Sequence, residues 1–183
     1  MTKSRKTGEI SGIPVYCRYD AAVDIEKVTP NPRNPNRHPD EQIALLAKII
    51  RAQGWRNPIR VSNRSGFVIA GHGRLAAARV LGVAQVPVER QDYANEAAEW
   101  QDMLSDNRIA ELADRDEQAI KDLLEELDDG ANDMDLTGYA QAVIEEMMTA
   151  APPSDPVDLD APDQNAARLV KCPKCGFEFE VPE

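Results

Sequence analysis

Two glycines, a histidine and an arginine stand together at Gly71-His72-Gly73-Arg74, directly after the apolar run 67–70. The run predicts a buried strand, and the Ala- and Leu-rich residues 74–81, closed by Gly82, predict a helix. Glycine lets the backbone approach a ligand closely, and free N–H groups at a helix N-terminus bind anions such as phosphate. Arg74 would add a forked, permanently charged donor. The turn therefore predicts a phosphate site, although a plain tight turn with a solvated arginine fits the same residues.

A second polar cluster, Ser105-Asp106-Asn107-Arg108, lies inside a segment that predicts a helix capped by Asn95. Asp and Asn are poor helix-interior residues because their side chains compete for backbone hydrogen bonds. Their presence therefore needs a reason. A metal or phosphate site is one explanation, and a local break or solvent-facing turn is the other.

The chain also carries one Cys-x-x-Cys pair, Cys172 and Cys175, followed by Gly176. Such a turn aims two thiolates at one point, as one knuckle of a zinc ribbon does, and the apolar–acidic alternation of residues 177–181 predicts a strand beside it. Structural zinc takes four ligands, however, and Cys17 is expected in the core. Zinc would have to be shared by two tails about a two-fold axis, which implies a homodimer. An unmetallated tail is the alternative.

The length of 183 residues allows one domain of ordinary size plus tails. No stretch approaches the ~20 apolar residues that span a bilayer, and the basic residues 1–8 have no apolar run behind them. Neither a membrane segment nor a signal peptide is predicted. Three cysteines with one close pair do not make a disulfide framework. We expect a soluble, cytoplasmic protein.

The net charge of −11 is distributed unevenly. Residues 1–90 contain 15 Lys and Arg against 7 Asp and Glu, whereas residues 91–183 contain 6 against 25. A basic half indicates a phosphate-bearing partner, and an acidic half would repel or mimic nucleic acid. A solvated acidic surface that keeps the protein soluble explains the second half as well.

The surrounding elements follow from the apolar, proline and glycine patterns. Four prolines in residues 29–39 exclude a helix and predict an extended loop, in which Asn34, Arg33 and Arg37 are hydrogen-bond donors if the loop faces the site. Residues 1–12 are expected to be disordered and residues 13–19 to form a short strand. The other expected elements are a helix from Pro39 to Gly54, strands at 59–62, 67–70 (the central strand) and 86–88, and helices at 95–112, 116–127 and 141–148. The helix at 116–127 is expected to bury Ile120, Leu123, Leu124 and Leu127.

In this order, residues 21–149 resemble the N-terminal domain of the ParB family, within the ParB/sulfiredoxin fold, and most of all its compact phage and mobile-element versions. The features that carry the resemblance are the loop 31–39, Gly54-Trp55 with Asn57-Pro58-Ile59-Arg60-Val61, the turn Ile69-Ala70-Gly71-His72-Gly73-Arg74, and Asp106-Asn107-Arg108-Ile109-Ala110-Glu111-Leu112.

The resemblance implies a nucleoside triphosphate at the turn, which is CTP in the partition proteins. The family's Gly-Glu-Arg-Arg turn reads Gly71-His72-Gly73-Arg74 here, so the glutamate and one arginine are absent and phosphate binding is what the turn retains. The family's Glu-Asn-x-Gln-Arg helix, which serves the metal and hydrolysis, keeps its acid–amide pair as Asp106-Asn107 but loses Gln-Arg. Hard oxygen ligands of this kind suit Mg²⁺ that bridges phosphates.

Other activities on this fold are constrained by the same residues. Sulfiredoxin chemistry needs a cysteine in the turn, where this chain has His72 and Gly73. A kinase of free serine needs a catalytic carboxylate, for which Glu41 and Asp106 are the candidates. Between residues 91 and 150 there are 18 Asp and Glu against 3 Lys and Arg, so the DNA-reading helix-turn-helix of partition ParB proteins is not expected.

The expected fold is α/β (α+β), a small mixed sheet with helices followed by an acidic helical subdomain. We expect an N-terminal tail with a short strand (1–20), a nucleotide-binding core (21–92), the helical subdomain (93–149), a Pro- and Asp-rich linker (150–168) and the Cys-x-x-Cys tail (169–183).

The expected function is a nucleotide-binding, DNA-associated accessory or switch protein of phage or mobile-element DNA metabolism, partnering DNA or a DNA-modifying or packaging protein. A nuclease, a nucleotide hydrolase (CTPase-like) or small-molecule kinase is the first alternative, and a non-catalytic interaction protein that partners a DNA methyltransferase or packaging protein is the second. The candidate catalytic residues are Asp106, Asn107 and His72. The candidate nucleotide- and phosphate-binding residues are Gly71, His72, Gly73, Arg74, Asn34 and Arg108, and the candidate metal ligands are Asp106 and Asn107 for Mg²⁺ and Cys172 and Cys175 for Zn²⁺.

Overall fold

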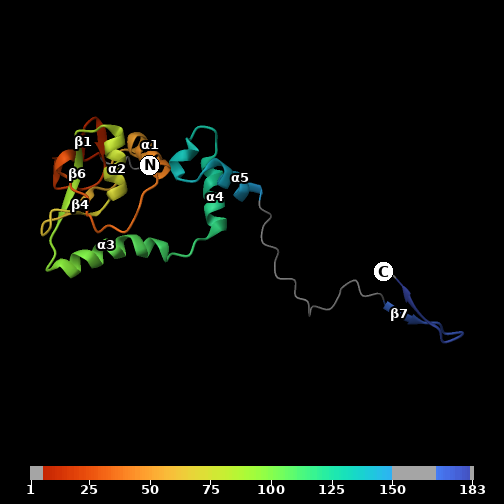
Figure 1. The fold of residues 1–183 in the computed structure, drawn as a ribbon. Helices are drawn as coiled ribbons and strands as arrows, with labels where there is room; N and C mark the ends of the chain where they lie inside the picture. Colours follow the sequence, from red (N-terminus) through yellow and green to blue (C-terminus); the bar gives the residue numbers. More distant parts are fainter. Residues whose placement is uncertain (1–5, 150–167, 182–183) are drawn as a thin grey trace. The chain divides into compact units, whose positions relative to one another are not determined.

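The computed structural model describes residues 6–149 and 168–181, with the side chains of 168–170 and 179–181 left out of the description. It divides into two compact units, residues 1–148 and 149–183, and each is described by itself. Figure 1 shows the ribbon of both units.

The first unit is built on a four-stranded mixed sheet. Its strands are β3 (Ala21–Asp24), β6 (Gln85–Gln91), β4 (Ile59–Ser62) and β5 (Val68–Ala70), hydrogen-bonded in that order. β6 pairs antiparallel with β3 and parallel with β4, and β5 pairs antiparallel with β4. The predicted mixed sheet with helices is confirmed.

The position of β5 corrects the expectation of a central strand. β5 lies at the edge of the sheet, and β6 is paired on both sides. The physical reason is that β4 and β6 are parallel neighbours, and parallel strands need a long connection. That connection contains β5 and helix α2, and α2 carries the chain past β4 to its other side, where β6 pairs with it. β5 is nevertheless fully buried, since α3 packs beside it.

The N-terminal residues are ordered earlier than expected. β1 (Gly8–Ile10) and β2 (Ile13–Val15) form an antiparallel hairpin, whereas disorder was predicted to residue 12 and a strand to residue 19. Ile10, Ile13 and Val15 are buried in the same core as Trp55. A short polar segment with three well-spaced apolar residues is thus held by tertiary burial rather than by local propensity.

Helices α1 (Asp40–Gln53) and α2 (His72–Leu81) pack against each other, and α2 also packs against β4 (Figure 1). The expected α1 is confirmed between Pro39, its N-cap, and Gly54, its C-cap with φ of 76°. A short 3-10 helix, η1 (Ile25–Lys27), precedes the proline-rich loop. The core of the unit consists mainly of Ile50, Trp55, Ile59, Val68, Leu75, Val86 and Val88.

Three helices follow the sheet. They are α3 (Glu96–Glu111), α4 (Glu117–Leu127) and α5 (Gln141–Thr149), with the 3-10 helix η2 (Met134–Thr137) between the last two. Asn95 and Asp116 cap α3 and α4 through their side chains, as their residue types indicate. The buried face expected for α4 is wrong in part: Leu124 is 3% exposed, but Leu123 is 60% and Leu127 42% exposed.

The second unit contains the antiparallel hairpin β7 (Arg168–Lys171) and β8 (Glu178–Val181). The predicted linker lies almost wholly outside the described residues. No helix within the described ranges is long and apolar enough to cross a membrane.

Candidate functional site

Helix α2 begins with an open N-terminus. Gly71 is its N-cap, in a left-handed conformation with φ of 97°. His72 and Gly73 therefore belong to the first turn of the helix, whereas the sequence predicted that the helix begins at Arg74. The first intrahelical bond runs from Leu75 N to Gly71 O, at 2.9 Å. None of the described side chains caps this end, and the first turn has no acidic residue. The first N–H groups of the helix therefore remain available to an anion.

Arg74 folds back over this turn. A Cβ atom at Gly71 would lie 2.9 Å from Nη2 of Arg74, so a larger residue there would displace the guanidinium. The Nε atom of Arg74 is buried without a hydrogen-bond partner in the described part of the chain. Burial lowers the pKa of Arg74, Asp106 works in the opposite direction, and Arg60 adds repulsion. A poorly compensated cation thus lies at the positive end of a helix.

A polar pocket of about 160 Å³ lies in front of the turn. Gly71, His72, Gly73 and Arg74 line one part of it, and Asp106 and Asn107 line another, so the structure brings the two sequence clusters together. Its remaining lining residues are Asn34, Asn36, His38, Gln42, Leu46, Ile69 and Ala70. What these residues do toward a ligand stays a prediction.

Arg60 is the site residue that the sequence clusters missed. A second pocket of about 300 Å³ shares Arg74 and Asp106 with the first and is also lined by Asn57, Pro58, Ala70, Glu89 and Arg60. Arg60 Nη1 lies 3.3 Å from Asp102 and 3.8 Å from Asp106, and its Nε lies 3.7 Å from Glu89. The sequence signal that could have pointed to Arg60 is its place between two apolar residues, Ile59 and Val61, of a short strand.

Asp106 and Asn107, the acid–amide pair on α3, differ in how far their side-chain atoms are already engaged by other residues. Asn107 donates its Nδ2 to the backbone oxygen of Met103, at 3.1 Å, which leaves Oδ1 as an acceptor. Among the residues that the structure describes, the ion pair of Asp106 is the long contact to Arg60, at 3.8 Å. Asn107 therefore bonds back to its own helix, as polar residues in helix interiors often do, and still lines the pocket.

His72 is tied to the proline-rich loop. Its Nε2 accepts a hydrogen bond from Asn31 N at 3.2 Å, so the remaining ring proton is on Nδ1. Burial, with a smaller contribution from His38, lowers the pKa of His72 to about 4. His72 is thus neutral at pH 7 and holds a loop, and its phosphate-contacting or catalytic role stays a prediction. His38 lines the same pocket, and its Nδ1 lies 3.0 Å from Gln42 Oε1.

The other predicted donors divide between pocket and surface. Asn34 lines the pocket and closes a local turn with Asn36. Arg33 instead stacks on Trp100 of α3, 4.3 Å from the ring centroid. The structure does not bring Arg108 to the pocket, because Arg108 faces solvent and pairs with Glu111 at 2.9 Å. A helix residue next to the site in sequence points about 100° away from it in space.

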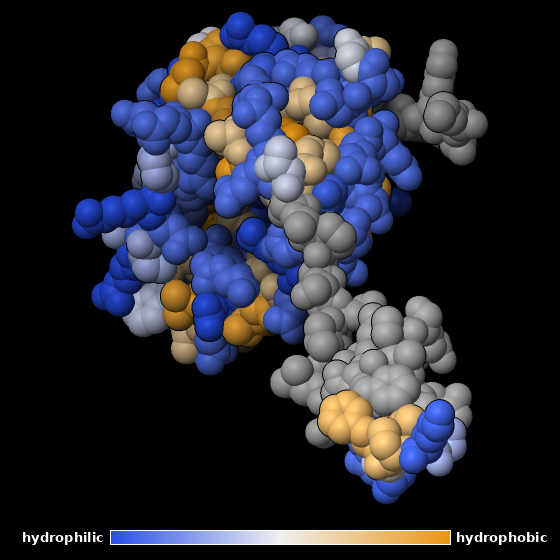
Figure 2. All heavy atoms as spheres, turned by 90° about the vertical axis from the view of Figure 1, so that its right-hand side faces the viewer, coloured by the Kyte–Doolittle hydropathy of each residue, from blue (hydrophilic) through white to orange (hydrophobic). Residues whose placement is uncertain are grey.

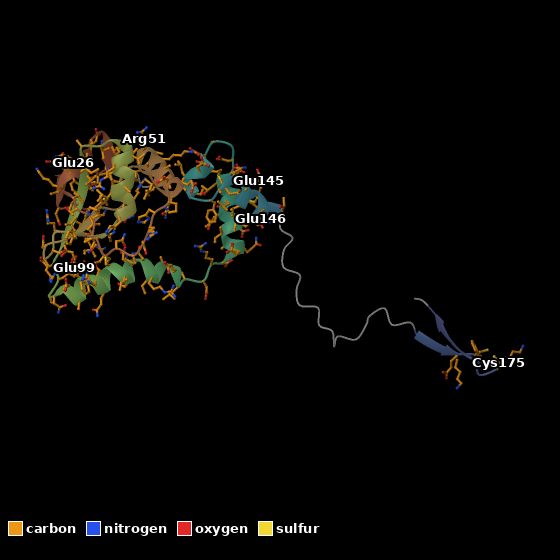
Figure 3. The ribbon with its side chains drawn as sticks, in the orientation of Figure 1. Glu26, Arg51, Glu99, Glu145, Glu146 and Cys175 are labelled. Carbon is orange, nitrogen blue, oxygen red and sulfur yellow. The ribbon has the colours of Figure 1, made fainter. Side chains whose placement is uncertain are left out.

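The position of α3 depends on a buried carboxylate near its start, visible in Figure 3. Glu99 is 1% exposed, accepts a short hydrogen bond from the Ser65 hydroxyl, and lies 3.3 Å from Arg64 Nη1. Both partners belong to the turn between β4 and β5. This contact fixes the helix that carries Asp106 against the sheet edge that leads into Gly71.

A larger, apolar pocket of about 410 Å³ lies elsewhere, between α4, η2 and the end of α1. Ile120, Leu123, Leu124, Leu127, Met134 and Leu136 form most of its wall. Figure 2 shows the side of the molecule that carries α4 and α5, on which small hydrophobic patches are surrounded by hydrophilic residues. The polar pocket is the better candidate site because the charged groups and the open helix end converge there.

Three comparisons bear on the family. The sequence model described as the ParB N-terminal domain matches residues 17–108. The ParB-like nuclease domain-containing protein YnaK of Escherichia coli (strain K12) is 39% identical over 64 residues, which is 35% of this chain and 72% of that protein.

Among solved structures, the C-terminally truncated chromosome-partitioning protein ParB from Caulobacter crescentus, complexed with CTP-gamma-S, is similar at a TM-score of 0.57 and 22% identity, over 70% of this chain and 76% of that chain. This likeness shows the fold. A structure of that ParB complexed to the centromeric parS site has a TM-score of 0.41 at 19% identity, over 73% of this chain and 74% of that chain. The domain match, supported by the similarity to YnaK, shows that the chain belongs to the ParB N-terminal domain family.

Proposed function

We propose that this chain binds a nucleoside triphosphate, with its phosphates at the N-terminus of α2. The observation that carries the proposal is Arg74: a buried Nε without a partner among the described residues, next to an uncapped helix end. A polyphosphate would supply the missing charge and accept the free N–H groups. The structural relative complexed with CTP-gamma-S supports a cytidine nucleotide as the first one to test.

Mg²⁺ fits this proposal as a phosphate-bound ion. The described residues contain no group of three or more His, Cys, Asp or Glu side chains that could hold a metal by themselves. The pocket does offer the Asp106 carboxylate and Asn107 Oδ1. Mg²⁺ is usually held by one or two protein oxygens together with substrate phosphates, so this donor set is adequate. When bound, the ion would neutralise part of the phosphate charge, while Asp106 and Asn107 would orient it.

An association with DNA is the second part of the proposal. The sheet-bearing half is basic, with 15 Lys and Arg against 7 Asp and Glu in residues 1–90. Nucleotide binding would then set the state of an accessory or switch protein that acts on DNA directly or through a DNA-modifying or packaging partner in phage or mobile-element metabolism. Basic charge of this kind gives salt-dependent binding without sequence readout.

A nuclease is the second candidate function. The name of the YnaK relative contains it, and His38, His72 and Asp106 line one pocket. Nucleases that use two metals place several carboxylates around them, whereas this pocket has one among its described lining residues. His72 is also engaged with Asn31 through Nε2. These contacts give the nuclease less support than nucleotide binding.

Calorimetric titration of the full chain with CTP, UTP, ATP and GTP, each with and without Mg²⁺, tests the proposal. We expect one triphosphate to bind, more tightly with Mg²⁺, and Asp106→Asn to remove the Mg²⁺-dependent gain. Asp114→Asn, an exposed change beyond the end of α3, is the matched control. In parallel, plasmid DNA is incubated with protein and Mg²⁺ or Mn²⁺. If none of the four nucleotides binds, and the wild type cleaves plasmid DNA while Asp106→Asn does not, the nuclease function is supported in place of nucleotide binding.

A further inference from the structure

The turn of the β7–β8 hairpin holds both cysteines of the tail in one local structure. Cys172 N donates to Phe177 O at 2.8 Å, and Gly176 N donates to Cys172 O at 2.9 Å. Gly176 adopts a φ of 75°, which lets the chain turn back into β8 after Cys175. Figure 3 shows Cys175 at the turn end of the hairpin. The two thiols are therefore presented by a closed turn between paired strands.

Within this turn the polar groups converge on one sulfur. The backbone N–H groups of Lys174 and Cys175 and the Cys175 thiol all lie close to the Cys172 sulfur. The two thiols stand on one turn beside each other, so they can bind the same ion.

The rest of the site has to come from elsewhere. Zn²⁺ in a structural site takes four ligands, and the turn gives two. In the described ranges no third Cys, His, Asp or Glu gathers with them. Cys17 packs against the core of the other unit, and burial raises the pKa of its thiol, so it is a poor ligand.

We propose that the Cys172–Cys175 turn is half of a tetrahedral zinc site, completed by the same turn of a second copy of this chain. Four thiols lose their protons to the solvent as one Zn²⁺ binds, which leaves a centre with a net charge of about −2. Lys174 stands within each turn and is exposed, so two lysines would lie beside the centre. A two-fold axis through the metal makes the contact self-complementary and closed.

Phe177 supports a second copy as the occupant. It follows directly after Gly176 and is 69% exposed, the largest exposed fraction among the large apolar side chains of the described residues. A phenylalanine beside a metal centre formed by two hairpins would be covered by its counterpart. The same residue on an isolated hairpin leaves its apolar ring in water, which costs free energy.

The experiment measures zinc content and mass of the same sample. Full-length protein expressed with zinc and purified without chelator is analysed by elemental mass spectrometry and by light scattering on a sizing column. We expect about half a zinc per chain in a dimer, the stoichiometry of one shared four-ligand site. A strong chelator should return zinc-free monomer, and added Zn²⁺ should restore the dimer.

Variants separate this site from other sources of zinc or dimers. Cys172→Ser and Cys175→Ser should each lose zinc and the zinc-dependent dimer together, while Cys17→Ser should keep both. No zinc in the wild type, one zinc per monomer, or a Cys172–Cys175 disulfide in place of metal would each overturn the shared site. Nucleotide titration of Cys172→Ser should match the wild type, so failure here is distinguishable from failure of the proposed function.

Discussion

Replacing Arg74 by methionine should preserve or raise folding stability while it weakens nucleotide binding. In the ligand-free protein the guanidinium lies over Gly71 with its Nε buried and unpaired among the described residues. An unsatisfied buried donor costs about 1–3 kcal/mol, and methionine fills similar space without a polar group. Some packing of the guanidinium plane is lost in exchange. The free energy of unfolding should therefore stay equal or rise by about 1 kcal/mol.

Binding should change in the opposite direction. A charge-assisted hydrogen bond to phosphate contributes about 1.5–3 kcal/mol, so the dissociation constant for the triphosphate should rise about 10- to 100-fold. The assays are urea unfolding followed by circular dichroism and calorimetric titration with nucleotide and Mg²⁺. Arg79→Met, an exposed change in the last turn of the same helix, should affect binding little.

The combination of the two measurements is what decides the role of Arg74. A loss of more than about 1 kcal/mol in unfolding free energy, with nucleotide affinity unchanged, would show that the arginine is a structural residue. That result would refute the assignment of the phosphate site, because the unpaired donor would then have been stabilising without a ligand.

Three further outcomes follow from particular contacts. Glu99→Gln removes the charge opposite Arg64 and should cost about 1–2 kcal/mol in urea unfolding, whereas Glu96→Gln, exposed in the same helical turn, should cost under about 0.5 kcal/mol. The pKa of His72 is lowered to about 4 in the folded protein, so the unfolded state takes up a proton first as the pH falls. Stability should therefore fall by at most about 3 kcal/mol between pH 6.5 and pH 4. A thermal-melting series in which His72→Asn leaves that pH dependence unchanged would contradict this. Gly71→Ala should lower the melting temperature more than Gly82→Ala, because both have positive φ but only the first meets a side chain.

The sequence predicted those parts of the fold that are specified locally. Helix ends were placed to within a residue or two by Pro39 and Gly54 for α1 and by Asn95 for α3, because capping residues act on their own turn. The Gly71 turn was likewise visible, since glycine at a strand–helix junction has few other uses. The predicted start of α2, at Arg74, is two residues later than the observed start at His72. The reason is that a helix can begin inside a glycine-rich turn when the N-cap itself is glycine.

What the sequence could not give depends on partners far along the chain. Glu99 looks like one more acid on an acidic helix, and only the Ser65–Arg64 turn, which precedes β5, makes it a buried residue. His72 was predicted to face the ligand. Its hydrogen bond from Asn31 N could not be predicted, because the path of the proline-rich loop was not known from the sequence. Arg60 escaped notice because its three acidic neighbours come from two elements, β6 and α3.

The distances around Arg60 suggest why one aspartate could be enough for a phosphate-bound ion. Arg60 holds Asp102 more closely, at 3.3 Å, than Asp106, at 3.8 Å, and it also contacts Glu89. Asp106 could therefore leave Arg60 for a cation at the cost of one long contact, while Arg60 remains compensated. The same carboxylate offsets the lowered pKa of Arg74, so its move toward a metal would be balanced only if phosphate reaches Arg74 at the same time. On the proposed function, metal and triphosphate should thus bind together rather than one after the other, which the titrations of Asp106→Asn with and without Mg²⁺ measure directly.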